Sequence, residues 1–184
     1  ADDGEWTSGW YVVDGTVNAT ERFVVKGDVN LILADGCMLD AAKGITVSSG
    51  NSLTIYAQST MQAQAGTLDA RGSWGAGIGG YAIDRDDPNR DCGSVTINGG
   101  NVSAQGSSAC AGIGGAGWGN AYFNSYGNCG TVTINGGWVM AYGAGKMSKA
   151  SAAAAIGNSG GGQLRWLHRR FGRPYHRECQ HERI

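Results

Sequence analysis

The sequence predicts an all-β fold, a β-solenoid over residues 1–162, followed by a short non-repeat C-terminal tail over residues 163–184. Three observations predict it. Glycine is unusually frequent, with 33 residues in a chain of 184, and it is interleaved with Val, Ile, Leu and Trp. A long motif recurs along the chain, and the apolar residues within it alternate with polar ones. Because a disordered glycine-rich chain lacks interleaved apolar residues, these observations favour a packed β-structure.

The repeat is clearest in two segments, DCGSVTINGGNVSAQG and NCGTVTINGGWVMAYG, which begin at Asp91 and Asn128, 37 residues apart. An apolar glycine turn, AGIGG, precedes each of them and begins at Ala76 and at Ala111. A degenerate copy, AAIGN, begins at Ala154. A period of this length is typical of solenoids, in which each unit buries its apolar face only by stacking on its neighbours.

Each unit is predicted to contain two short strands joined by a corner. Val95 and Ile97 alternate with polar neighbours, which is strand periodicity, and the TVTI segment that begins at Thr131 repeats the pattern. The NGG that follows supplies residues that tolerate positive φ, so the chain can turn there between two strands. Six earlier segments are also predicted as short strands that end at Gly or near it, over residues 10–15, 21–27, 29–36, 38–44, 45–50 and 52–58.

The segments GWYVVDGTV, GITVSSGNSLTIYAQ and AGIGG…CGxVTINGGxVxA carry a family resemblance. Over residues 5–162 the chain resembles the repeat domains of large surface proteins from anaerobic Gram-positive gut bacteria. The resemblance implies a right-handed parallel β-helix, an adhesin-like or carbohydrate-binding role, and an extracellular or cell-surface location for the parent protein. It implies no catalytic residues.

The tail differs sharply from the body in composition and charge. Residues 1–162 carry 8 basic and 13 acidic residues, whereas residues 163–184 carry 6 and 2 and hold all 3 histidines. Such a contrast indicates a segment of separate origin. A frame shifted by one base permits the tail to be read as SYGGSIGGSGG and later GSVNMNG, which restores both repeat signatures. We therefore interpret the tail as a frameshifted continuation of the repeat.

The last rung of a solenoid has unpaired strand edges that need a cap. The tail is expected to cap its own solenoid or to pack against a second copy, and a homodimer through the tail or the open solenoid end is predicted. The aromatic and aliphatic residues that would supply apolar contact are Trp166, Leu167, Phe171 and Tyr175.

Metal-ligand residue types are concentrated in the tail. The predicted Zn²⁺ ligands are His168, His176, Cys179 and His181. Imidazole and thiolate are preferred zinc ligands, although this spacing matches no standard zinc finger. The alternative to a metal site is that a frameshift brought these residue types together by chance.

An open position on such a zinc ion would lower the pKa of its bound water to about 7 and generate hydroxide. Glu178 and Glu182 are predicted to act as the catalytic base or to orient a ligand. The arginines predicted to bind a small anionic substrate are Arg169, Arg170, Arg173 and Arg177. The sequence thus predicts metal-dependent hydrolysis of activated esters or phosphoesters. The alternative for these arginines is a solvent-facing or dimer-facing charge run, and nucleic acid is not an expected partner.

A non-catalytic, carbohydrate-binding or adhesive module is the second hypothesis. Its predicted sugar contacts lie in an aromatic insertion and are Trp118, Tyr122, Phe123 and Tyr126. The acidic loop from Asp84 to Asp91 offers oxygen ligands for calcium, but its arginines and spacing favour a solvated insertion. The body contains no histidine, which excludes Ser/His/Asp and Cys/His catalysis there.

Two further sequence features limit the possible classes of protein. No apolar run approaches about 18 residues, so no membrane span is predicted. The chain has 5 cysteines, an odd number that argues against a closed disulfide framework. Cys92 and Cys129 occupy the same place in two repeats and are predicted to be buried thiols, with a disulfide as the alternative.

Overall fold

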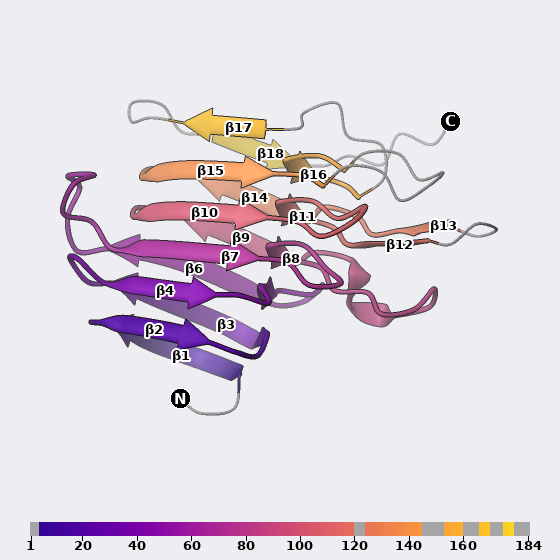
Figure 1. The fold of residues 1–184 in the computed structure, drawn as a ribbon, viewed down its shortest axis with the longest axis horizontal. Coiled ribbons are helices and arrows are strands. Elements are labelled where there is room, and N and C mark those ends of the chain that lie inside the picture. Colours follow the sequence, from indigo (N-terminus) through magenta and orange to yellow (C-terminus); the bar gives the residue numbers. More distant parts are fainter. Residues whose placement is uncertain (1–3, 120–123, 145–152, 160–165, 170–174, 179–184) are drawn as a thin grey trace.

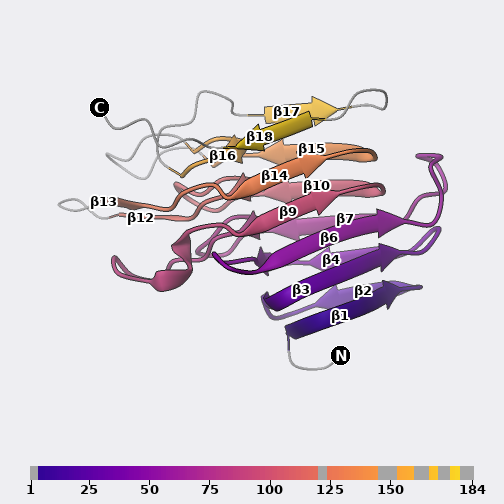
Figure 2. The same cartoon turned by 180° about the vertical axis from the view of Figure 1, so that it is seen from behind.

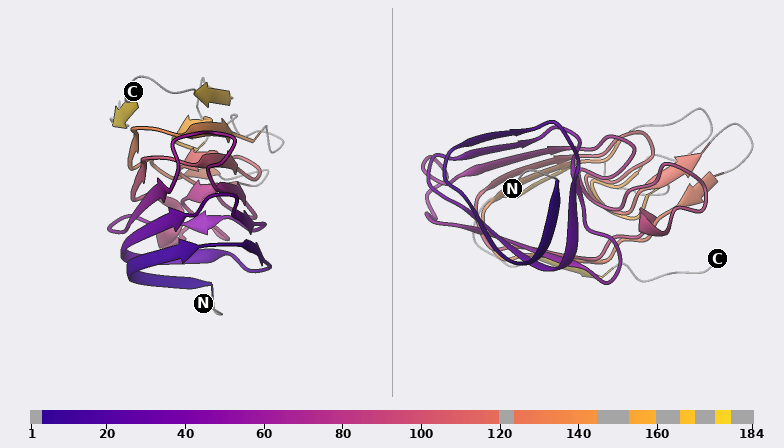
Figure 3. Two further views of the ribbon diagram at one scale, coloured as in Figure 1. Left: turned by 90° about the vertical axis from the view of Figure 1, so that its left-hand side faces the viewer. Right: turned by 90° about the horizontal axis from the view of Figure 1, so that it is seen from below.

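The computed structural model describes residues 4–119, 124–144, 153–159, 166–169 and 175–178. Their strands wind into a parallel β-helix whose rungs stack along one axis, which confirms the predicted all-β solenoid (Figures 1 and 2). Viewed along that axis, successive rungs overlie one another around a common centre (Figure 3). Each complete rung contributes one strand to each of three walls.

Wall 1 lies in front in Figure 2 and contains β1 (Glu5–Val13), β3 (Phe23–Leu33), β6 (Ser52–Ala57), β9 (Ser94–Ile97) and β14 (Thr131–Ile134). Wall 2 lies in front in Figure 1 and contains β2 (Thr16–Ala19), β4 (Met38–Ala41), β7 (Thr67–Arg71), β10 (Asn101–Gln105) and β15 (Trp138–Tyr142). Wall 3 contains the start of β3 and the short strands β5 (Ile45–Thr46), β8 (Ile78–Gly79), β11 (Ile113–Gly114) and β16 (Ile156–Gly157). Because β3 spans two walls, walls 1 and 3 belong to one ten-stranded sheet that also includes the tail strand β18, and wall 2 forms a six-stranded sheet with the tail strand β17.

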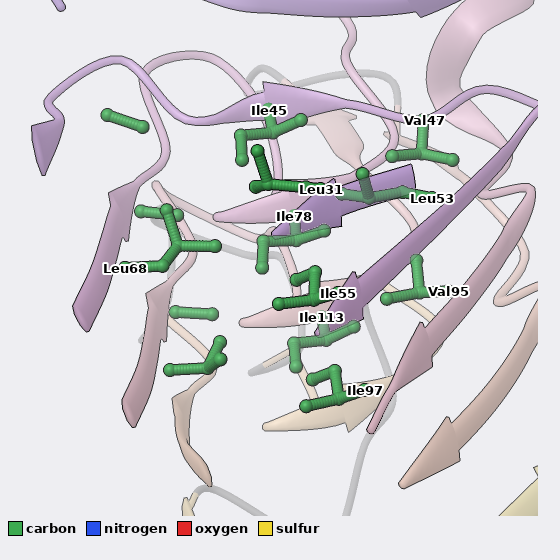
Figure 4. Close-up of a cluster of buried hydrophobic side chains, with 14 of the residues drawn as sticks. Leu31, Ile45, Val47, Leu53, Ile55, Leu68, Ile78, Val95, Ile97 and Ile113 are labelled. Carbon is green, nitrogen blue, oxygen red and sulfur yellow. The ribbon is translucent and has the colours of Figure 1, made fainter. Parts of the chain in front are cut away.

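Columns of like residues form the core between the walls. On wall 3, Phe23 is followed in register by four isoleucines, at positions 45, 78, 113 and 156. On wall 2, Leu39, Leu68, Val102 and Val139 form one column, and an alanine column runs beside it. Figure 4 shows Ile45, Ile78 and Ile113 of wall 3 and Leu68 of wall 2 facing the same core as side chains of wall 1 such as Ile55 and Ile97. Since burial of one such aliphatic side chain contributes about 1.5–3 kcal/mol, the columns fix the register of the rungs.

The glycine turns are required by the close stacking of wall 3. Gly79, Gly114 and Gly157 lie in register and have φ values of 135°, 140° and 145°. A Cβ atom at Gly79 would overlap the carbonyl oxygen of Gly114, and one at Gly114 would overlap that of Gly157. The AGIGG motif therefore pairs an inward isoleucine with a glycine where the next rung leaves no room for a side chain.

The N-terminal end of the core is closed by aromatic residues. Trp6 is 4% exposed and stacks on Phe23 with ring centroids 4.2 Å apart. Tyr11 packs against Trp6 at 5.7 Å. These rings cover much of the first rung, although Val17 stays 41% exposed beside them.

The structure differs from the predicted strands in several places. The strand β2 was not predicted, and the AGIGG segments predicted as turns contain the two-residue strands of wall 3. The two segments predicted over 21–27 and 29–36 form one bent strand, β3, because Gly27 adopts a φ of 81° and turns the corner while β1 stays paired with both halves. The strand β7 was not predicted. Its sequence, TLDAR, is short and half polar, and only the stacking of Leu68 between Leu39 and Val102 reveals its inward face.

Two elements depart from the parallel winding. The hairpin of β12 (Gly117–Gly119) and β13 (Asn124–Tyr126) projects beyond wall 3, near the loop that contains the 3-10 helix η1 (Pro88–Arg90). In the tail, β17 (Trp166–Arg169) pairs antiparallel with β15, and β18 (Tyr175–Glu178) pairs antiparallel with β14. None of the described residues forms a helix with the length and hydropathy of a membrane span.

Candidate functional site

The structure places the predicted zinc ligands on two different sheets where it describes them. The backbone of His168 lies opposite Met140 on wall 2, and that of His176 lies opposite Thr133 on wall 1. Cys179 and His181 lie outside the described residues. Within the described ranges, no group of three or more His, Cys, Asp or Glu residues is placed to hold a metal ion. The zinc site stays a prediction.

The other residues predicted for hydrolysis are divided in the same way. Arg169 ends β17, and Arg177 and Glu178 end β18. Arg170, Arg173 and Glu182 lie outside the described residues. No catalytic arrangement is therefore assembled from the described part of the tail.

The acidic loop uses its carboxylates to hold the backbone. Asp87 Oδ1 accepts hydrogen bonds from the backbone N–H of Asn89 at 2.9 Å and from its side-chain amide at 3.1 Å. Asp91 Oδ1 accepts from the backbone N–H of Asn128 at 2.7 Å, which ties the loop to the next rung. These contacts favour a structural insertion over a calcium site, because two of the carboxylates are already used by the chain.

A cleft of about 340 Å³ lies where the corner turns between walls 2 and 3 meet the start of β12. Its lining consists of Gly72, Ser73, Trp74, Ser107, Ser108, Gly117 and Trp118. The volume lies at the lower end of the range for small-ligand pockets. Among the described residues, the lining combines two indole rings with three hydroxyl groups and contains no ionisable side chain, which suits an uncharged ligand.

Trp74 forms one side of the cleft in an unusual backbone conformation. Its φ is 59°, in the left-handed region, and its side chain is 61% exposed. Ala109 occupies the equivalent place in the next rung, four residues before the stacked isoleucine, and has a φ of 61°. The turn itself thus demands the left-handed conformation, which costs a non-glycine residue about 1–2 kcal/mol. A large exposed aromatic residue at a position suited to glycine points to a functional reason for its presence.

The partly buried guanidinium of Arg22 holds the turn that carries Trp74. Arg22 Nε donates to Thr46 Oγ1 at 2.7 Å, and Nη2 donates to the carbonyl oxygens of Ala76 at 3.0 Å and Gly80 at 3.3 Å. The guanidinium also lies 5.0 Å from the ring centroid of Tyr81. Burial lowers the pKa of Arg22 to about 10, so it is still protonated at neutral pH.

Ser107 connects the two turns across the rungs. Its Oγ accepts a hydrogen bond from the backbone N–H of Gly75 at 2.9 Å and donates to the carbonyl of the same residue at 3.0 Å. The backbone N–H of Ala82 donates to the Trp74 carbonyl at 3.0 Å. The Trp74 side of the cleft is therefore fixed before any ligand binds.

The opposite side is fixed by a small apolar cluster. Trp118 packs against Ala82, Cys110 and Ala116, which are each 1% exposed or less. The backbone N–H of Gly117 donates to Cys110 Sγ at 3.4 Å. Burial raises the pKa of the Cys110 thiol, which keeps it protonated and uncharged beneath the cleft.

Of the predicted sugar contacts, the structure brings Trp118 into the cleft. Tyr126 is 40% exposed and pairs with Gly117 across the hairpin, while Tyr122 and Phe123 lie outside the described residues. The sequence identifies Trp74 only as one of several aromatic residues that could stack on sugar rings, because its partnership with residues 107–118 depends on stacking. The available signal was an aromatic residue just before AGIGG, where the next repeat has alanine.

The cysteines described by the structure are buried thiols. Cys92 and Cys129 are 5% and 7% exposed, which confirms the predicted burial at this repeat position. Cys37 and Cys110 are also buried thiols. These four residues thus act as small apolar side chains, either in the main core or in the small apolar cluster that packs against Trp118.

Comparison with known proteins agrees with this architecture. Three segments, residues 65–81, 95–118 and 132–162, match a family model described as a beta helix repeat. They include strands β7, β8, β10 and β15 and every residue that lines the cleft. No curated protein and no solved structure matches the chain. These matches and the parallel winding of the strands support a β-helix domain.

Proposed function

We propose that the chain is a non-catalytic, carbohydrate-binding module of a cell-surface protein, and that the cleft between Trp74 and Trp118 binds an uncharged saccharide. The observation that carries this proposal is the exposed indole of Trp74 at the rim of a preformed cleft. The backbone of this residue holds it there in the strained left-handed conformation. An aromatic face is electron-rich, and it attracts the weakly positive C–H groups on one face of a sugar ring. The cleft volume of about 340 Å³ suits about one or two rings.

Hydrogen-bonding groups in the cleft are suited to orient such a ligand. Ser73 and Ser108 line it together with Ser107, whose hydroxyl is engaged by Gly75. Sugar hydroxyls both donate and accept, and serine hydroxyls complement them in either sense. Because none of the described lining residues carries a carboxylate, imidazole or other ionisable group, this part of the cleft offers binding groups without an acid or base for hydrolysis.

The zinc-dependent hydrolase predicted from the tail has less support from the geometry. Its described histidines lie on separate walls, and it requires residues outside the described ranges. The proposed setting is the surface of a Gram-positive gut bacterium, as the family resemblance implies. The proposed origin of the tail is a frameshift in a longer repeat gene.

Binding to neutral saccharides tests the proposed function. We would screen the full chain on an array of neutral and acidic oligosaccharides and measure hits by isothermal titration calorimetry. Trp74→Ala should weaken binding about tenfold, because it removes one stacking face worth roughly 1 kcal/mol or more. Trp118→Ala should act in the same direction.

Trp10→Ala is the matched control, because Trp10 is 64% exposed but stacks on Tyr56, away from the cleft. It should leave the affinity unchanged. Equal loss in the Trp10 and Trp74 variants would contradict the assignment of the cleft. A complete absence of saccharide binding by the unmodified chain would contradict the proposed function.

A further inference from the structure

The C-terminal end of the solenoid is closed by strands that run against the direction of the body. Every strand pair between successive rungs of the described body is parallel. By contrast, β17 pairs antiparallel with β15 through four residue pairs, Val139↔Arg169 to Tyr142↔Trp166. Likewise, β18 pairs antiparallel with β14 from Thr131↔Glu178 to Ile134↔Tyr175.

This pairing reverses the order in which the chain visits the walls. In the body the chain passes from wall 1 to wall 2, as from β14 to β15, whereas the tail reaches wall 2 with β17 before wall 1 with β18. The tail therefore does not add a rung of the same kind. It occupies the backbone N–H and C=O groups that would otherwise form the exposed edge of β14 and β15.

The N-terminal end of the solenoid presents edges that match the ones that the tail covers. Among the described residues, β1 and β2 have no strand on their outer side. They run in the same direction as β14 and β15, as the unbroken series of parallel pairs requires. Trp10, Val12 and Val17 on these strands are 64%, 60% and 41% exposed.

The inward residues of β2 also continue the columns of wall 2. Val17 and Ala19 are in register with Leu39 and Ala41, and the same columns end at Val139 and Ala141. A second copy placed with its β2 on β15 would set Val17 above Val139 and Ala19 above Ala141. The step between two copies would then reproduce the step between two rungs.

We infer that the tail strands are an end cap that competes with a second copy of this chain for the edges of β14 and β15. When the cap is displaced, the β1–β2 end of one copy stacks on the β14–β15 end of the next. This contact is head-to-tail and does not close on itself, so it produces chains of copies. The homodimer predicted through the open solenoid end accordingly requires release of the tail.

The test uses the full chain with the cap weakened in place. A double variant, His168→Pro with His176→Pro, removes one backbone donor from each tail strand and disfavours pairing within a sheet. The matched double variant, His168→Ala with His176→Ala, keeps both donors. Sedimentation velocity and light scattering over a wide range of protein concentration would report the mass of each.

The proline variant should show a weight-average mass that rises about twofold or more with concentration, whereas the alanine variant and the unmodified chain stay monomeric. Adding Val17→Asp to the proline variant places a charge in the proposed contact and should restore the monomer. Val17→Asp alone, checked by circular dichroism, controls for folding.

Two results would overturn the inference. One is a proline variant that stays monomeric at every concentration. The other is association that persists unchanged after Val17→Asp, because general aggregation of a damaged chain would not depend on the N-terminal edge.

Discussion

The rungs of the body and the two tail strands belong to the same sheets, yet different forces place them there. In the body, each strand carries an inward column residue such as Ile78 or Leu68, and each tight turn carries the glycine that its neighbour requires. In the tail, β17 and β18 follow no repeat and pair in the opposite direction. The repeat thus specifies register through side chains, while the tail strands join the sheets by backbone pairing in the opposite direction.

This difference predicts unequal sensitivity to substitution. Changes in the columns or glycine turns of the body should cost several kcal/mol, because they act on close-packed atoms. Changes in the tail should alter the end of the solenoid and leave the inner rungs folded.

Gly114→Ala is expected to have the largest effect on stability. The added Cβ would overlap the Gly157 carbonyl oxygen, and the φ of 140° is unfavourable for alanine. Because both problems involve backbone that cannot move without separating two rungs, the free energy of unfolding should fall by about 4 kcal/mol or more. Urea denaturation followed by circular dichroism would measure it.

Gly15→Ala is the matched control, since nothing lies within 4 Å of a Cβ atom placed there and its φ is not positive. Its effect should stay within about 1 kcal/mol. Similar losses in the two variants would show that glycine content, rather than the stacking of wall 3, governs stability.

Ile78→Ala should come next, with a loss of about 2–5 kcal/mol in the free energy of unfolding. Ile78 is fully buried between Ile45 and Ile113, so its removal leaves a cavity between two rungs. Val12→Ala on the exposed face of β1 should cost less than about 0.5 kcal/mol. A small effect of Ile78→Ala would mean that the isoleucine column does not fix the register.

Arg22→Met should reduce stability by about 2 kcal/mol and also weaken saccharide binding. The variant removes the guanidinium donor from the carbonyl oxygens of Ala76 and Gly80, so the Ala76 carbonyl loses this hydrogen bond while Gly80 keeps the one from the Ala76 N–H. Chemical denaturation and calorimetry would separate the two effects. Lys43→Met is the control, because the Lys43–Glu21 ion pair is exposed and contributes at most about 1 kcal/mol. A variant that loses stability yet binds saccharide normally would show that Arg22 does not position the cleft.

The local parts of the fold were predictable from the sequence. The VTINGG strands and corners carry a short pattern with a direct steric cause, and the structure confirms them. The AGIGG segments were predicted as turns, but they contain the two-residue strands of wall 3. The second glycine of each NGG has the positive φ that the pattern indicates, 92° at Gly100 and 87° at Gly137. Alternation and glycine spacing depend on neighbours in the chain, which a sequence displays.

The features that depend on stacking were not predictable in the same way. The strand β7 has a weak apolar pattern, and Leu68 is recognised as a core residue only beside Leu39 and Val102. The cleft joins Trp74 to Trp118 through turns of different rungs, so neither residue marks it alone. The antiparallel pairing of the tail has no sequence signature, because an open backbone edge accepts many sequences.

Loss of zinc from the site predicted in the tail should have the smallest effect on the fold. It is also the change that differs most in its chemistry from the changes in the body. The prediction is that the unmodified chain retains one equivalent of zinc after dialysis, and that a double variant, His176→Ala with Cys179→Ala, loses it. Mass spectrometry of the metal content would measure both. Because the described body has no cluster of metal ligands and its columns need no ion, the melting temperature should change little between the two proteins.

An unmodified chain that retains no zinc would contradict the predicted ligands. A large drop in melting temperature on loss of zinc would instead show that the metal helps to hold the antiparallel cap, and the contrast between a side-chain-ordered body and a backbone-ordered tail would then fail.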